Sequence, residues 1–160
     1  MSGNDTALRR LVVAIDGSEG SLHAAEHAVS LAAAVGADLV FVYVLDDEVL
    51  RELAVAFPDG GGAGAERLEA DAQGRLEQPA EWARERGCPC ARRVERGDPV
   101  ERIEAVAEEV GADLIVVGRT GRRGVRRVLL GSVARRLAES SAVPVLVIGC
   151  PRGEAAAGAG

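Results

Sequence analysis

Short apolar blocks recur along this chain, and longer amphipathic stretches separate them. Four of the blocks are rich in Val, Ile and Leu and have the continuous apolar pattern of strands that are buried on both faces. They are residues 10–15, 38–45, 113–117 and 143–148. A fifth block, Ala91–Glu95, is more polar, which is typical of a strand at the edge of a sheet.

The stretches between these blocks have helical spacing. The sequence Asp-Gly-Ser at 16–18 predicts a capped helix over 19–35. Asp98 in the N-cap position, followed by Pro99, predicts a second helix that extends to residue 110. Two further helices are expected over residues 65–86 and 132–140.

One stretch, Asp46 to Gly64, lacks a clear period. Pro58 and the glycine run at 60–62 favour a flexible surface excursion there. The charged helix that follows is expected to break or kink at Pro79, because proline cannot donate the helical hydrogen bond.

Strands and helices therefore alternate, which predicts an α/β fold with a five-stranded parallel sheet and helices on both faces. Composition agrees, since 48% of residues are apolar but only 2% are aromatic. We expect one domain over residues 1–150 and a disordered tail over 151–160.

The formal net charge of −6 argues against bulk binding to nucleic acid or to anionic membranes. No apolar run reaches the roughly 18 residues that a membrane span requires, and residues 1–6 lack the pattern of a signal peptide. These features lead us to expect a cytoplasmic protein. The three cysteines are then expected to be reduced thiols.

The chemistry of the chain is concentrated in a glycine pattern near its C-terminus. Gly118 and Gly121 follow a predicted strand, and Gly131-Ser132 precedes a predicted helix after nine intervening residues. Glycines at such a strand-to-helix connection let backbone N–H groups approach a polyphosphate, and the helix dipole favours its charge.

This Gly-x2-Gly-x9-Gly-Ser pattern resembles that of the universal stress protein family, ATP-binding branch. The resemblance extends to Val12–Ser18 and to Gly97–Val100. It implies a Rossmann-like fold of the adenine nucleotide alpha hydrolase kind, with the sheet order 3-2-1-4-5. The ligand crevice would then lie between the first and fourth strands.

The resemblance also implies a binding site for ATP, with Mg2+ as the accompanying ion. Its residues would be Asp16, Val44, Gly118, Gly121, Gly131 and Ser132. No catalytic residue and no protein metal ligand is assigned. The resemblance further implies a homodimer through the last strand, Val143 to Ile148, and an unidentified protein partner.

The leading hypothesis is thus a nucleotide-dependent sensor or adaptor in a stress response. A nucleotide-free adaptor of the same fold, and less so a slow ATPase or an adenylating enzyme, stay open as alternatives. In the nucleotide-free alternative, Asp16 and Ser132 would serve only as helix caps.

The arginines of residues 119–127 offer a further alternative, binding of RNA or a phosphoprotein. The sequence His23-Ala-Ala-Glu-His27 matches a zinc-peptidase pattern but is expected on a helix away from the crevice.

Overall fold

The computed structural model describes residues 7–58, 61–120 and 130–149 of the 160-residue chain. Its strands are β1 (Arg10–Ile15), β2 (Asp38–Asp46), β3 (Cys90–Gly97), β4 (Leu114–Gly118) and β5 (Val145–Ile148). Its helices are α1 (Glu19–Val35), α2 (Asp47–Ala56), α3 (Gly61–Glu85), α4 (Pro99–Val110) and α5 (Ser132–Ser140). In the described part of the chain, no helix is both long and apolar enough to cross a bilayer.

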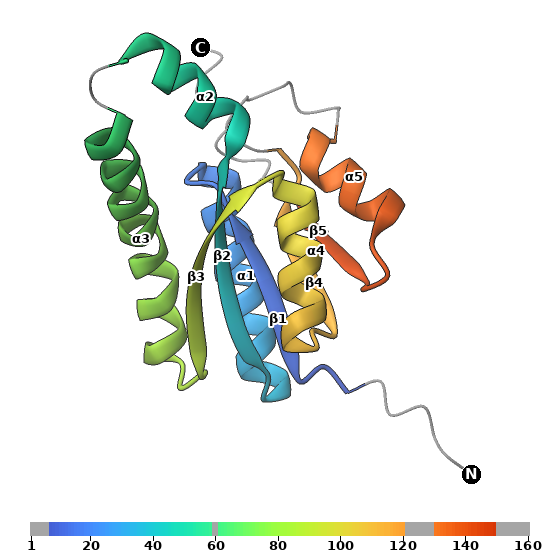
Figure 1. Cartoon of the computed structure of the whole chain (residues 1–160). Helices are drawn as coiled ribbons and strands as arrows, with labels where there is room; N and C mark the ends of the chain where they lie inside the picture. Colours follow the sequence, from blue (N-terminus) through green and yellow to red (C-terminus); the bar gives the residue numbers. More distant parts are fainter. Residues whose placement is uncertain (1–6, 59–60, 121–129, 150–160) are drawn as a thin grey trace, which may run out of the picture.

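The five strands form one parallel sheet in the order β3-β2-β1-β4-β5, which confirms the predicted fold class and strand order (Figure 1). The strand β1 lies at the centre, with Ile15 opposite Tyr43 of β2 and Val13 opposite Val116 of β4. The polar strand β3 lies at one edge, as its sequence predicts.

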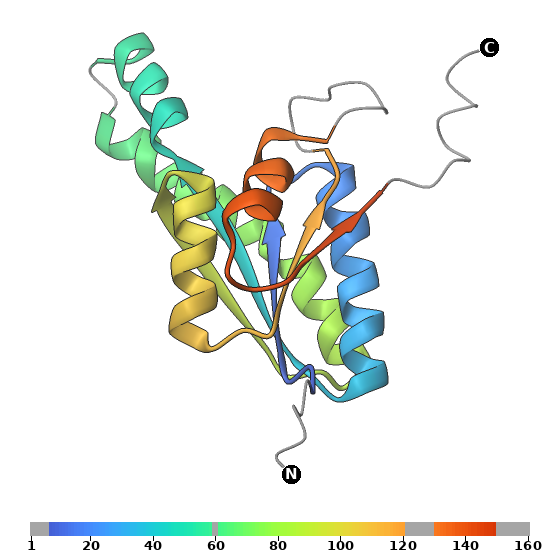
Figure 2. The same cartoon turned by 90° about the vertical axis from the view of Figure 1, so that its right-hand side faces the viewer.

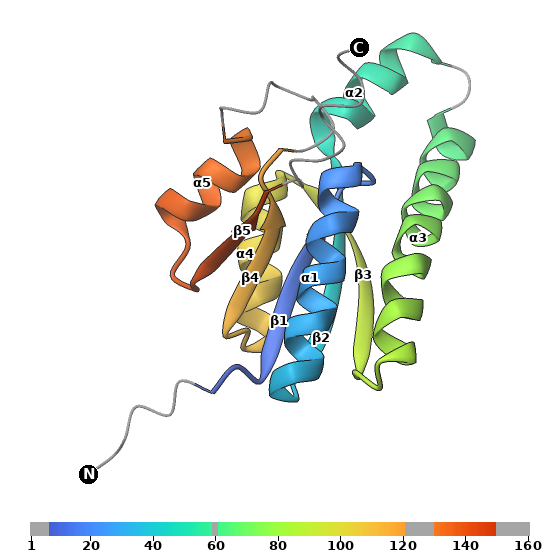
Figure 3. The same ribbon diagram turned by 180° about the vertical axis from the view of Figure 1, so that it is seen from behind.

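Helices cover both faces of the sheet. The helices α1 and α3 pack on one face and α4 and α5 on the other, as the views from the side and from behind show (Figures 2 and 3). Alternation along β1 divides its side chains between the two layers: Leu11 and Val13 contact the α1 and α3 side, whereas Val12 contacts the α4 and α5 side. These three side chains are fully buried, so the core is continuous on both faces of the central strand.

The helix α1 shows how local sequence sets an element. The hydroxyl of Ser18 caps its N-terminus by accepting a hydrogen bond from the N–H of Ser21 at 3.1 Å. Gly36 ends it in the left-handed conformation with φ 74°, which an L side chain rarely adopts. Alanines line its buried face, where small side chains let the helix lie close to the sheet: Ala24, Ala25, Ala28 and Ala32.

The expectation of an irregular excursion over 46–64 is wrong. Residues 47–56 form α2, because the carboxylate of Asp46 accepts a hydrogen bond from the N–H of Glu48 at 2.9 Å and caps the helix. No residue of α2 is buried, and the helix projects beyond the carboxyl end of the sheet (Figure 1).

The expected break at Pro79 does not occur either, because α3 continues through it. Pro79 is fully buried in the packing against the sheet, so tertiary contacts outweigh the lost hydrogen bond. The tail after Gly149 lies outside the described residues.

Candidate functional site

The strand order reverses direction at β1, and this defines the candidate site. The chain leaves β1 to form α1 on one face of the sheet, and the chain that follows β4 leads to α5 on the other face. Because β1 and β4 are parallel neighbours, their carboxyl ends meet at one edge of the sheet. Asp16 and Gly118 therefore lie at the switch point where ligands bind in sheets of this kind.

Asp16 organises the turn between β1 and α1. Its carboxylate accepts hydrogen bonds from the backbone N–H of Ser18 at 2.9 Å and from the Ser18 hydroxyl at 2.5 Å. The hydroxyl of Ser21 accepts from the N–H of Asp16 at 3.3 Å and donates to the carbonyl of Ser18 at 2.9 Å. The helix cap is thus Ser18, and the alternative in which Asp16 itself caps α1 is wrong.

Gly118 ends β4 directly beneath the first turn of α1. A Cβ at this position would lie 2.9 Å from the carbonyl oxygen of Gly20 and 3.2 Å from the nitrogen of Ser21. Both contacts are with backbone atoms, so a side chain would have to displace the helix. The structure therefore explains this glycine by the packing of α1 on β4, a reason that spacing alone does not reveal.

The two ends of the glycine pattern meet. The N–H of Gly131 donates to the carbonyl of Arg119 at 2.7 Å, and the N–H of Arg119 donates to the carbonyl of Ile148 at 2.8 Å. Gly121 and residues 122–129 lie outside the described residues, so the contact predicted for Gly121 stays a prediction. The hydrogen bond between Gly131 and Arg119 nevertheless holds together the two ends of the connection between β4 and α5.

Gly131 is the N-cap of α5, and among the described residues no side chain caps this end. Ser132 is exposed as the first residue of the helix, so the alternative in which Ser132 is the cap is also wrong. A helix start of this kind directs backbone N–H groups and the positive end of the dipole at whatever lies before it.

Val44 lies level with Asp16 on the neighbouring strand. Tyr43 pairs with Ile15 in the register of β1 and β2, so the next residues of both strands are side by side. The Val44 side chain packs in the apolar layer on the α4 and α5 side. The fold thus brings together Asp16, Val44, Gly118, Gly131 and Ser132 at one end of the sheet.

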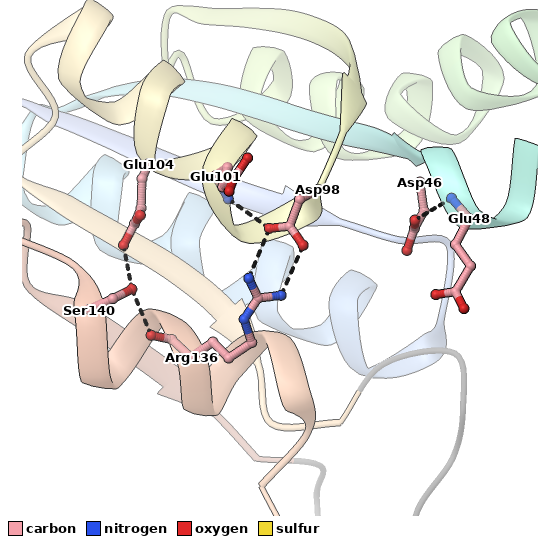
Figure 4. A network of polar contacts seen from close by, with 7 residues as sticks. All are labelled: Asp46, Glu48, Asp98, Glu101, Glu104, Arg136 and Ser140. Carbon is pink, nitrogen blue, oxygen red and sulfur yellow. Dashed lines mark hydrogen bonds and ion pairs between the residues drawn. The ribbon is translucent and has the colours of Figure 1, made fainter.

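An ion pair that the sequence did not indicate joins α4 to α5 beside this site. Arg136 of α5 donates two hydrogen bonds, at 3.0 and 3.1 Å, to the carboxylate of Asp98, which also caps α4 by accepting from the N–H of Glu101 (Figure 4). The Arg136 guanidinium lowers the pKa of Asp98, against the opposing effect of partial burial. A second link, from the Ser140 hydroxyl to Glu104 at 2.7 Å, lies further along the same helices. The position of α5 is therefore fixed on α4 by polar contacts.

Two shallow hollows that the described residues line lie away from this end of the sheet. One is at the α5–β5 connection, around Pro144, and the other is beside Gly36 at the opposite end of α1. Within the described part of the chain, no group of three or more His, Cys, Asp or Glu residues is placed to hold a metal ion. The candidate site thus consists of backbone groups and a few polar side chains at the carboxyl ends of β1 and β4.

A parallel α/β fold with a switch point of this kind defines a large class of proteins. Within it, the sequence model of the universal stress protein family matches residues 7–149. The chain therefore belongs to the universal stress protein family.

Known proteins of this family are similar over nearly the whole chain. A universal stress protein of Methanocaldococcus jannaschii, MJ0531, is 36% identical over 148 residues, which cover 91% of this chain and 85% of that protein. The solved structure of a second protein of that organism, MJ0577, matches with a TM-score of 0.80 over 92% of this chain and 99% of the other, at 22% identity. A universal stress protein solved in complex with cAMP matches with a TM-score of 0.63 at 30% identity, covering 89% of this chain and 98% of the other.

Proposed function

We propose that this protein binds ATP, with Mg2+, at the carboxyl ends of β1 and β4 and acts as a nucleotide-dependent sensor or adaptor. The observation that carries the proposal is the start of α5, where Gly131 is the N-cap without a side-chain hydrogen bond from the described residues, directly beside the switch point. Membership of the family and the cAMP complex of a relative at 30% identity support an adenine nucleotide as ligand.

The residues of the site fit such a ligand. The first N–H groups of α5 and the exposed hydroxyl of Ser132 are donors suited to phosphate oxygens. Asp16 lies on the other side of the switch point, where its carboxylate is suited to accept from ribose hydroxyls, and the backbone of Val44 is suited to meet the adenine. Gly118 lets the first turn of α1 lie close against the end of β4, beside Asp16.

The arrangement favours binding over catalysis. Hydrolysis needs a group that positions or deprotonates the attacking water. Asp16 is assigned to the nucleoside, and its carboxylate already accepts from Ser18. We therefore propose that the nucleotide shifts a conformational equilibrium, with α5 transmitting the change to α4 through Arg136 and Asp98.

Calorimetric titration of the purified chain with Mg-ATP, ADP, AMP and cAMP tests the proposal. Ser132→Ala is expected to weaken ATP binding roughly tenfold, because it removes a hydrogen bond to a charged group. Ser140→Ala is the matched control at the opposite end of α5, about 12 Å away along the helix, and is expected to leave the affinity unchanged.

Three results, from this titration or from an assay of phosphate release, would favour an alternative or remove a residue from the proposed site. No measurable ATP affinity in the wild-type chain would favour the nucleotide-free adaptor. Equal losses in both serine variants would remove the start of α5 from the site. Steady phosphate release well above background, lost in Ser132→Ala, would favour the slow ATPase.

We further propose that two copies of the chain pair through β5. This strand lies at the edge of the sheet, and all four of its residues are apolar and partly exposed. The carbonyl of Pro144 accepts from Ile115 of β4 and that of Ile148 accepts from Arg119, the residue after β4. By alternation, the backbone groups of Val145 and Val147 face away from the sheet. Val147→Pro would remove one outward donor and is expected to convert the dimer to monomer in sedimentation equilibrium; a wild-type chain that is already monomeric at micromolar concentration would contradict the proposal.

A further inference from the structure

The only two histidines of the chain lie one helical turn apart on α1. His23 is partly exposed and His27 is exposed, on the side of the helix that does not contact the sheet. The nucleotide site proposed above uses neither of them. Their pairing is therefore a feature of the fold that needs its own explanation.

The geometry of the two rings is that of a chelate. The Nε2 atoms are 3.2 Å apart, whereas the ring centroids are only 4.6 Å apart with the planes at 88°. A straight N–H···N hydrogen bond between rings placed end to end would separate the centroids by roughly 5.5 Å. The two nitrogens thus form a bent hydrogen-bond contact and lie close enough for a single cation to bind both in place of the shared proton.

This separation fits one metal ion bound by both nitrogens. With metal–nitrogen bonds of about 2.0–2.1 Å, nitrogens 3.2 Å apart subtend an angle of roughly 100° at the metal. That angle lies between the values of square-planar and tetrahedral coordination. Little movement of either side chain is then needed on binding, so the site is organised in advance.

Glu26 supports the same arrangement from the opposite edge of the first ring. Its Oε2 lies 3.8 Å from Nδ1 of His23. A carboxylate at this distance adds negative charge beside the histidine pair, which favours a bound cation.

We propose that His23 and His27 form a binding site for one late first-row divalent cation of the Ni2+, Cu2+ and Zn2+ class. Imidazole nitrogen suits these ions, whereas Mg2+ and Ca2+ prefer oxygen ligands. Because no larger group of ligands is placed to hold a metal within the described residues, the two histidines supply the protein ligands, and water occupies the other positions. The protein then carries a transition-metal site that is separate from the nucleotide crevice.

Calorimetric titration of the full chain with Ni2+ or Zn2+, in a buffer that does not bind metal and without nucleotide, tests the proposal. The wild-type chain is expected to bind one ion of each. His23→Ala and His27→Ala are each expected to weaken binding roughly 100-fold, because the second ligand acts at high effective concentration once the first is bound. Titration with Mg2+ alone is expected to give no binding at these residues.

A matched control separates pairing from histidine content. The double variant His27→Ala, Ala34→His keeps two histidines on α1 but places them about 16 Å apart along the helix. Ala34 is exposed, so the variant is expected to fold and to bind as weakly as His27→Ala. Equal Ni2+ affinity in the wild-type chain and either single variant, or full affinity in the double variant, would overturn the proposal. Circular dichroism of each variant without metal checks that the fold is retained, and the double variant carries the test if His23→Ala fails to fold.

Discussion

Replacing Gly118 by alanine tests whether this glycine of the pattern serves packing. The added methyl group would lie 2.9 Å from the carbonyl oxygen of Gly20 and 3.2 Å from the nitrogen of Ser21, closer than side-chain carbons normally approach backbone atoms. The first turn of α1 cannot yield easily, because Gly20 and Ser21 are buried and Ser18 caps the helix there. The substitution therefore forces a backbone shift of several tenths of an ångström.

The expected cost follows from two opposing contributions. Overpacking a well-packed site costs about 1–3 kcal/mol. Replacing glycine by alanine also restricts the unfolded chain, which stabilises by about 0.4–1 kcal/mol where the native backbone permits it. The net expectation is a loss of roughly 1–2 kcal/mol in the free energy of unfolding.

Equilibrium unfolding in urea, followed by far-ultraviolet circular dichroism, measures this loss. Gly74→Ala in α3 is the control, because nothing lies within 4 Å of a Cβ built there. The control is expected to gain about 0.5–1 kcal/mol from helix propensity. If Gly118→Ala proves as stable as the wild-type chain while Gly74→Ala shows its gain, the packing explanation is wrong.

Two further predictions concern caps. Asp98→Asn keeps an N-cap side chain but loses the charge that Arg136 contacts, so we expect only a small loss of stability at pH 7, since the pair is exposed to solvent. Because the folded-state pKa of Asp98 lies below the usual aspartate value of 3.8, this contribution is present above about pH 4 and is lost as the pH falls through the lower folded-state pKa. Urea unfolding of both proteins at pH 7 and pH 3 should show a smaller difference at pH 3, and an undiminished one would refute the ion pair as its cause. Ser18→Ala removes the cap of α1 and a donor to Asp16, so thermal unfolding should reveal a loss of about 1 kcal/mol; an unchanged midpoint would show that the turn is held by other contacts.

Local sequence determined most of the secondary structure. The apolar blocks, the caps at Ser18 and Asp98 and the terminating Gly36 act within a few residues, so the pattern of the chain predicted β1, α1 and α4 within a residue or so of the observed bounds. The same local reasoning failed at α2, because Pro58 and the glycines downstream favoured a loop and the capping role of Asp46 was not predicted. It also failed at Pro79, where burial against the sheet overrides an intrinsic preference.

Only the tertiary structure decided how the individual site residues pack. The sequence alone pointed to Gly118 as a ligand contact, and the structure adds that a Cβ at this position would meet backbone atoms of α1, about 100 residues earlier in the chain. Likewise, Asp98 was predicted as a cap, yet its pairing with Arg136 depends on α4 and α5 packing side by side. Contacts within one element follow from spacing, because the backbone repeat fixes them. Contacts between elements depend on how the layers pack, and the folded chain sets that.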